Sequence, residues 1–219
     1  MNVYAEYFSE NGIDYRKTTI IQIGDSWELL GSAILKNPGS AIPLDDEIDN
    51  ETFEKLSGIC QNSNHKHWKK FKGDATMNCL VKIFNGSFVG DTKEISGVIL
   101  LFNLHYIREA DINKARILFD RSNSENTFPN IEEIKNLIKD KPVYIGWKDE
   151  VKKLKTEKIK DFAKNIFDYL ILEDSCYLER NYNSNKFYHP LGIGFVNKDL
   201  LKISPVFESL KRFQKQLEL

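Results

Sequence analysis

The feature that most constrains the fold is an uninterrupted apolar segment near the middle of the chain, Gly97-Val98-Ile99-Leu100-Leu101-Phe102-Asn103. A strand with one face in water alternates apolar and polar residues, whereas a continuous apolar run is typical of a strand buried on both faces. Such strands occur chiefly in sheets that helices cover on both sides. The segment therefore predicts an interior strand of an α/β domain.

Shorter apolar runs of the same kind recur along the chain, and helical patterns lie between them. We expect further strands at 18–23, 32–35, 80–84, 143–147 and 169–172, and helices at 46–59, 129–139, 149–167 and 205–217. This alternation predicts one domain over residues 1–219, a three-layer α/β/α sandwich with a central, mostly parallel sheet. Ligands bind such sheets outside the carboxyl ends of the strands, so the residues that follow each strand are the candidates for chemistry.

Two of these strand ends carry polar residues suited to binding a planar ligand. The strand at 32–35 continues into Asn37-Pro38-Gly39-Ser40. There the proline holds Asn37 extended, and Gly39 allows the backbone to approach a ligand closely. The strand at 97–102 ends in Asn103, whose side-chain amide can donate and accept hydrogen bonds at the edge of a base. Each segment alone is also compatible with an ordinary turn or cap.

A third segment, Tyr188-His189-Pro190-Leu191, follows a polar loop late in the chain. His189 can act as a hydrogen-bond donor or electrophile near neutral pH. Leu191 belongs to a group of apolar residues spaced by glycines, which is the type of wedge that enters a base stack. A buried edge strand with a hydrogen-bonded histidine is the alternative.

Taken in order, the three segments resemble the motifs of the uracil-DNA glycosylase superfamily. Asn37-Pro38-Gly39 is similar to the first motif of its mismatch-specific and single-strand-selective branches, the run 98–103 to the strand that ends in the base-reading asparagine, and His189-Pro190-Leu191 to the second motif. A bacterial and phage domain family with Asn-Pro-Ser-Thr-Ala-Asp-like, Asn-Leu-Phe-x-x-Arg-like and His-Pro-Leu segments is more similar still. The resemblance spans about residues 30–200.

The resemblance implies a role for each matching residue. Asn37 would position the water that attacks the sugar C1′, and His189 would stabilise the negative charge that develops on the leaving base. Leu191 would fill the gap left by the flipped nucleotide. The base itself would be contacted by the remaining motif residues, Pro38, Gly39, Ser40 and Asn103.

The first motif departs from that of the most efficient uracil enzymes, because it lacks their aspartate and the following tyrosine. Gly39 and Ser40 leave room where the tyrosine would stand, so a larger or modified base is expected to fit. Asp45 and Asp46 follow closely, and we expect Asp46 to supply the missing carboxylate as a general base. The start of a helix is the alternative role of this acidic pair.

Contacts to DNA are expected from Lys69, Lys70 and Arg108. The two lysines lie in His65-Lys66-His67-Trp68-Lys69-Lys70-Phe71-Lys72, where lysines suit phosphates and aromatic residues suit base stacking. A solvated surface with Trp68 and Phe71 in the core is the alternative. The whole chain has 31 basic and 32 acidic residues, a net charge of −1, so DNA binding must rely on local patches.

The composition narrows the remaining choices. Three widely spaced cysteines (Cys60, Cys79 and Cys176) predict reduced core thiols in a cytoplasmic protein, with no metal and no cofactor. No apolar run is long enough for a membrane span, the N-terminus has no secretory pattern, and a monomer is the default.

Three functions fit these observations. The first is a monofunctional DNA glycosylase that flips out an unusual or modified base, such as a hypermodified base of phage DNA, in repair or phage defence. The second is a non-catalytic sensor of a nucleotide or modified nucleic acid on the same fold, motivated by the missing aspartate. The third is a hydrolase of free nucleosides or nucleotides, which would explain the near-neutral charge.

Overall fold

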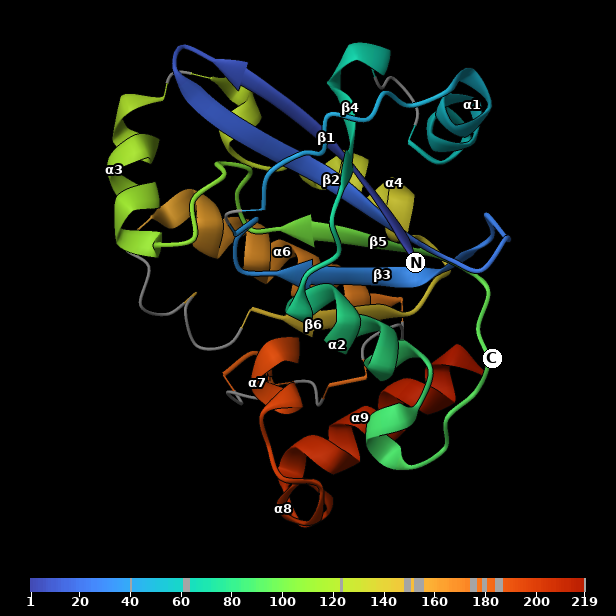
Figure 1. The fold of residues 1–219 in the computed structure, drawn as a ribbon. Helices are drawn as coiled ribbons and strands as arrows, with labels where there is room; N and C mark the ends of the chain where they lie inside the picture. Colours follow the sequence, from blue (N-terminus) through green and yellow to red (C-terminus); the bar gives the residue numbers. More distant parts are fainter. Residues whose placement is uncertain are drawn as a thin grey trace.

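A computed structural model describes residues 1–39, 41–60, 64–122, 124–147, 151, 156–173, 177–178, 181–183 and 187–218 (Figure 1). The strands are β1 (Asn2–Glu10), β2 (Ile13–Ile23), β3 (Leu29–Leu35), β4 (Trp68–Phe71), β5 (Gly97–Asn103) and β6 (Val143–Gly146). The helices of the described residues are α1 (Asn50–Ile59), α2 (Ala75–Phe84), α3 (Ile112–Arg121), α4 (Ile131–Ile138), α6 (Glu157–Leu172), α7 (Pro190–Gly194), α8 (Lys198–Lys202) and α9 (Pro205–Leu217). Three short 3-10 turns are η1 (His65–His67), η2 (Ser87–Val89) and η3 (Glu125–Thr127).

The strands form one sheet in the order β4-β1-β2-β5-β3-β6. β5 pairs in parallel with β3, and β3 in parallel with β6, whereas the other three pairings are antiparallel. The expectation of a mixed α/β chain is therefore confirmed, and the expectation of a mostly parallel sheet is wrong. The difference arises from β1, a strand that the sequence analysis did not predict. β1 pairs antiparallel with β2 and β4, and β2 also pairs antiparallel with β5.

β1 and β2 form a hairpin whose turn explains why they are antiparallel. Asn11 and Gly12 connect the strands, with φ angles of 52° and 74°. Two consecutive residues in the left-handed region, of the type Asn-Gly, are the strongest short-range signal for a hairpin. Because β1 enters the sheet through this turn, it lies beside β2 in the opposite direction.

The expected strand at 97–103 is confirmed as β5, and all seven of its residues are buried. It lies between β2 and β3, so neighbouring strands satisfy its backbone on both edges. The helix expected at 205–217 is confirmed as α9, and the strands expected at 18–23, 32–35 and 143–147 correspond to parts of β2, β3 and β6. Of the helix expected at 149–167, residues 149–150 and 152–155 lie outside the described residues.

Two expected strands are helical instead. Residues 80–84 end α2, in which Met77, Leu80 and Ile83 are buried at helical spacing and Asp74 caps the first turn. Residues 169–172 end α6, whose buried side chains likewise repeat every three or four residues. A short apolar run cannot separate a strand from a buried helix segment, and the longer amphipathic pattern decided both cases.

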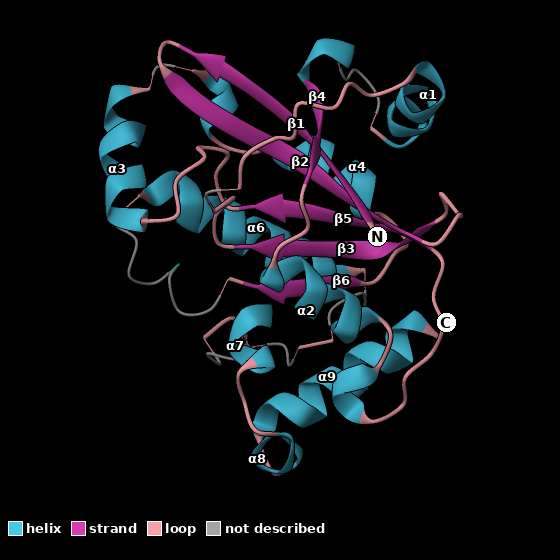
Figure 2. Ribbon diagram, viewed as in Figure 1, coloured by secondary structure: helices cyan, strands magenta, loops and turns pink. Residues whose placement is uncertain are grey.

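Figure 2 shows helices on both faces of the sheet, with α4 and α6 on one side and α2 on the other. Cys60 and Cys79 are buried and free, while Cys176 lies outside the described residues. None of the helices in the described part of the chain combines the length and apolar character that a membrane span requires.

Candidate functional site

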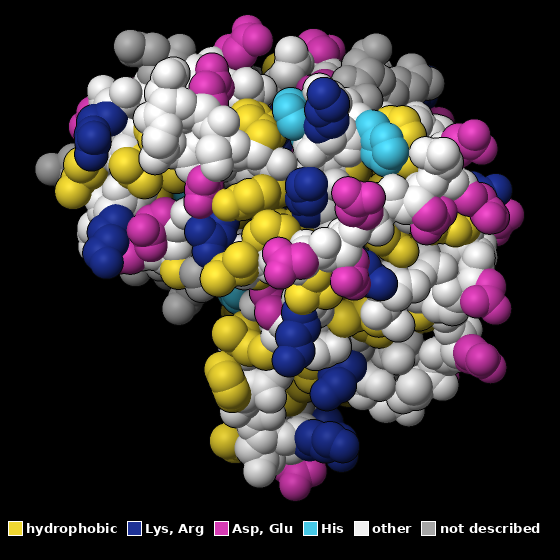
Figure 3. Space-filling view, turned by 45° about the horizontal axis from the view of Figure 1, so that its top comes forward, with side chains coloured by type: hydrophobic (Ala, Val, Ile, Leu, Met, Phe, Trp, Pro, Cys, Tyr) yellow, Lys and Arg dark blue, Asp and Glu magenta, His cyan; other side chains and the backbone are white. Residues whose placement is uncertain are grey.

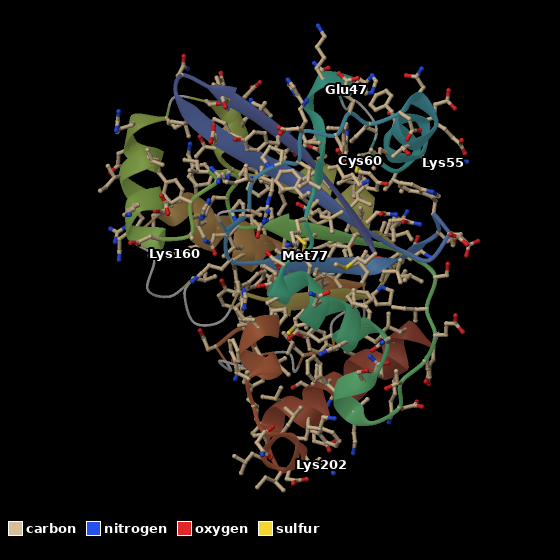
Figure 4. All side chains as sticks on the ribbon, in the orientation of Figure 1. Glu47, Lys55, Cys60, Met77, Lys160 and Lys202 are labelled. Atoms are coloured by element: carbon tan, nitrogen blue, oxygen red, sulfur yellow. The ribbon has the colours of Figure 1, made fainter. Side chains whose placement is uncertain are left out.

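The carboxyl ends of β3, β5 and β6 meet at one edge of the sheet and line a pocket of about 460 Å³. The start of α2 and the segment 189–192 close its other sides, and Figure 4 labels Met77, which lies at this end of α2. The pocket brings together five of the residues selected from the sequence: Asn37, Pro38, Gly39, Asn103 and His189. Leu191 lines it as well, and Ser40 lies outside the described residues.

Asn37 is held by the chain that follows β5. Its side-chain nitrogen Nδ2 donates hydrogen bonds to the carbonyl oxygens of Glu109, at 2.8 Å, and Ala110, at 3.2 Å. Because Nδ2 is engaged with these two carbonyl oxygens, the oxygen Oδ1 is the atom that can accept a hydrogen bond from a ligand or a water. Gly39 has a φ of 73°, and the space around a Cβ there is open, so this glycine serves the left-handed backbone of the loop.

Asn103 is the last residue of β5 and pairs with Leu35 of β3. Only 1% of it is exposed, and among the described residues Nδ2 has no hydrogen-bond partner. A buried donor without a partner costs about 1–3 kcal/mol, which an acceptor in the pocket would recover. Asn103 therefore offers a donor to a carbonyl or ring nitrogen of a bound ligand.

His189 precedes α7, a short helix rather than the buried edge strand given as the alternative for this segment. The hydroxyl of Tyr144 donates to the carbonyl oxygen of Tyr188 at 2.6 Å and fixes the backbone next to the histidine. Pro190 begins the helix, and its Cδ would lie 3.1 Å from a Cβ at Gly146, so the glycine at the end of β6 permits this close approach. His189 is half-buried and lines the pocket.

Apolar side chains at α7 differ in exposure. Ile193 is buried, Leu191 is partly buried at the pocket wall, and Phe195, which also lines the pocket, is 80% exposed. A large exposed aromatic side chain at a pocket rim is suited to contact a base stack or another apolar surface. The sequence analysis selected Leu191 alone for this role.

Asp46 does not line the pocket. It is exposed in the segment before α1, where Asp49 rather than Asp46 caps the helix, and its Oδ2 lies 3.8 Å from Nζ of Lys70. The carboxylate that does line the pocket is Asp74. Its Oδ1 accepts the backbone N–H of Met77 at 2.9 Å as the N-cap of α2.

The residues expected to contact DNA lie away from the pocket walls. Arg108 donates from Nε to the carbonyl oxygen of Ala41, at 2.8 Å, and from Nη1 to Asp14, at 3.3 Å, so it ties the first-motif loop to β2. Lys69 and Lys70 are half-buried on β4, at the edge of the sheet.

The aromatic residues beside these lysines belong to the core. Trp68 is 2% exposed and Phe71 is 3% exposed. This agrees with the alternative interpretation of the segment, which placed both residues in the core. His65 stacks on Phe53, and His67 stacks on Phe8. One face of each imidazole ring is therefore already covered and is not available to a base. Base stacking by the segment is not supported, because its aromatic side chains are buried and its histidines are already stacked. Figure 3 shows basic and acidic side chains interspersed on the face that it presents.

Arg16 is, like Asp74, a pocket residue that the sequence analysis missed. It lies in β2, is 2% exposed, and donates from Nη2 to the carbonyl oxygen of Pro38. Burial lowers its pKa to about 10, against a rise caused by Asp74, so the guanidinium is still charged at neutral pH. A lone arginine in a strand pattern carries no signal that it faces a ligand site.

The described residues contain no group of three or more His, Cys, Asp or Glu side chains that could hold a metal ion. Comparisons of the chain with protein-family models, with curated proteins and with solved structures found no match. The function must therefore be inferred from the pocket itself. Its lining combines amide groups, an imidazole, a carboxylate and a buried guanidinium around one partly apolar cavity.

Proposed function

We propose that the chain is a monofunctional DNA glycosylase of the uracil-DNA glycosylase type, acting on an unusual or modified base in repair or in defence against phage DNA. One observation carries the proposal: three segments separated by more than 60 residues each, around Asn37, Asn103 and His189, line the same pocket. Its volume lies within the range of roughly 300–1,000 Å³ typical of small-molecule sites. The pocket therefore suits a single extruded base.

The pocket residues can divide the reaction among them. Nδ2 of Asn103 donates to an acceptor on the base, and Oδ1 of Asn37 accepts from the attacking water. The C1′–N bond breaks as the water oxygen bonds to C1′, and the electron pair of the broken bond remains on the base. His189 donates a hydrogen bond to that charge, and the water proton passes to solvent or to Asp74, which takes the general-base role first assigned to Asp46.

DNA is the proposed partner, and the exposed rim supplies the contact. Phe195 and Leu191 both line the pocket, and the exposed Phe195 lies where a side chain could replace a flipped nucleotide in the stack. Lys69 and Lys70 remain candidates for phosphate contacts. Since the net charge is −1, binding is expected to be weak and to fall steeply with salt.

Release of free bases, followed by mass spectrometry, tests the proposal. Substrates are uracil-containing, mismatched and hypermodified phage DNA, and the variants are Asn37→Ala and His189→Ala. Two matched controls lie outside the pocket: Asn78→Ala on the exposed side of α2 and His65→Ala beside Phe53. We expect one base to be released by the wild type and both controls, and release to fall about 10²–10³-fold in the two pocket variants.

Other outcomes would favour the competing functions. Binding of one DNA without release, weakened by Asn103→Ala, would replace the enzyme by a sensor. Release from free nucleosides or nucleotides alone would replace DNA as the substrate. Release that survives both pocket variants would contradict the assignment of this pocket as the active site.

A further inference from the structure

Arg16 has fewer partners than a buried cation requires. Among the described residues its Nε and Nη1 have no hydrogen-bond partner, and no carboxylate lies within ion-pair distance of it. Its other contacts are the carbonyl oxygen of Pro38 and the ring of Phe71, whose centroid lies 5.6 Å from Cζ. An unpaired charge at this depth is costly, so an unpaired arginine that lines a cavity indicates a ligand.

A β-bulge places Arg16 on the pocket side of the sheet. Ala5 pairs with Thr19, but Tyr7 pairs with Arg16, so β2 has one more residue than β1 between the two pairs. Residues directly opposite each other share a face, and the extra residue moves Arg16 to the face of Thr19. Without the bulge, the alternation of β2 would turn Lys17 to that face instead.

The same face carries Asn103. Thr19 pairs with Leu101 across β2 and β5, and Asn103 follows Leu101 by two residues, so both point to the side that Arg16 shares. Leu101, Asn103 and Arg16 all line the pocket. Two buried side chains with unpartnered donors thus face one cavity from neighbouring strands.

The guanidinium of Arg16 lacks a paired anion in the described part of the pocket. Asp74 is the acidic side chain of the described lining, but among the described residues no ion pair joins it to Arg16. One carboxylate oxygen of Asp74 instead accepts from the backbone of α2. A ligand group with one negative charge would pair with Arg16 and accept from its free guanidinium donors.

We propose that the pocket binds an oxyanion group at Arg16, and that the group is a carboxylate carried by the base. The inference rests on the proposed function, because it names the class of base that the glycosylase pocket accepts. A planar carboxylate matches the fork of the guanidinium, and the base ring that carries it reaches Asn103 on the same face. A phosphate of a free nucleotide is the other source of the same chemistry.

Equilibrium binding to the full chain tests this, with free bases as probes. The first pair is 5-carboxyuracil and uracil-5-carboxamide, and the second is orotate and its carboxamide, because each carboxamide keeps the shape and removes the charge. Isothermal titration of the wild type is expected to show each carboxylate binding at least about tenfold more tightly than its carboxamide. This comparison needs no variant, so it does not depend on how Arg16 affects folding.

Arg16→Met supplies the second arm, since methionine keeps an unbranched apolar chain against Phe71 and removes the charge. The preference for the carboxylate should fall to less than about twofold, while Arg121→Met, exposed at the end of α3 and outside the pocket lining, should retain it. Inorganic phosphate, and deoxyuridine compared with its 5′-monophosphate, identify the source. A preference for phosphate that Arg16→Met abolishes would support the oxyanion site but overturn the carboxylate.

Equal binding of each acid and its amide together with no preference for a phosphate, or no saturable binding of any anionic probe at millimolar concentration, would overturn the oxyanion site. These outcomes are independent of catalysis. If uracil is released from DNA while the matched bases bind equally, the glycosylase proposal stands and the oxyanion site fails. If no DNA substrate is cleaved but the carboxylates bind through Arg16, the reverse holds.

Discussion

The two halves of the sheet contribute to the pocket in different ways. In the parallel half, β5, β3 and β6 present their carboxyl ends at one edge, and Asn103, Asn37 and Trp147 reach the pocket simply because they follow those strands. In the antiparallel half, β4, β1 and β2 do not share a direction, and one residue, Arg16, reaches the same pocket through a bulge. Strand direction therefore places several residues at once, while in the antiparallel half the bulge decides which residue of β2 faces the pocket.

The segment after β5 joins the two halves. The backbone N–H of Leu104 donates to the carbonyl oxygen of Leu35 in the parallel half, and the backbone N–H of Arg16 donates to the carbonyl oxygen of Tyr106. His105, between them, is fully buried and packs edge-on against Phe119. This junction therefore connects the parallel half of the sheet to the antiparallel half.

The largest expected effect is acid unfolding at this junction. Burial lowers the pKa of His105 to about 3, so between about pH 6.5 and pH 3 the unfolded chain binds a proton that the folded chain excludes. The contribution of His105 to the free energy of unfolding is therefore fully present above pH 6.5. It falls as the pH falls, by roughly 5 kcal/mol at the low end. Urea unfolding from pH 7 to pH 4 should show this slope.

His105→Leu should flatten the dependence of the free energy of unfolding on pH. His65→Ala, which removes a histidine stacked on Phe53, should leave that dependence unchanged. A wild-type stability that is constant from pH 7 to pH 4 would contradict the prediction.

The next effect concerns catalysis and two acidic residues. Asp74→Asn keeps an N-cap for α2, since asparagine caps as well as aspartate, but removes the carboxylate from the pocket. Single-turnover base release should fall about 10²-fold, the low end for a general base. Asp46→Asn, outside the pocket lining, should stay within about twofold of the wild type. The opposite ranking would return the role of base to Asp46.

The smallest effect uses one glycine from each half. Gly12 in the hairpin and Gly39 in the first-motif loop have φ angles of 74° and 73°, and a Cβ added at either glycine would meet no atom within 4 Å. Each Gly→Ala change should cost about 1–2 kcal/mol of unfolding free energy through the left-handed backbone alone. Thermal or urea unfolding should give similar losses for the two variants.

Activity should separate the two glycines. Gly39→Ala should also reduce base release, because the loop carries Asn37, whereas Gly12→Ala should leave release by the folded protein unchanged. Equal activities would mean that the first-motif loop is no more sensitive than the distant hairpin turn.

Much of the candidate site could be predicted from the sequence because it depends on strand ends. The run 97–103 predicts a buried strand, and Asn103 is its last residue, so a local pattern located one pocket residue. The loop Asn37-Pro38-Gly39 was found in the same way, since it follows β3 directly. Asp46 follows the same loop but lies outside the pocket lining. Nearness in sequence to the loop says nothing about the direction in which the chain leaves it.

The features that could be predicted correctly from the sequence are local. The continuous apolar run of β5, the amphipathic pattern of α9 and the turn chemistry around Pro38 are properties of neighbouring residues, and physical chemistry acts on them within a few positions. These features predicted the mixed α/β class and the edge of the sheet where a ligand would bind.

The tertiary structure alone decided the rest. The direction of β1 and β2, the helical state of 80–84, and the burial of Trp68 depend on which distant segments supply a partner surface. Arg16 is the clearest example, because its position in the pocket depends on one extra residue in the pairing of β2 with β1. The register of a strand pair is set by contacts across the sheet, and a shift of one residue turns every side chain to the opposite face.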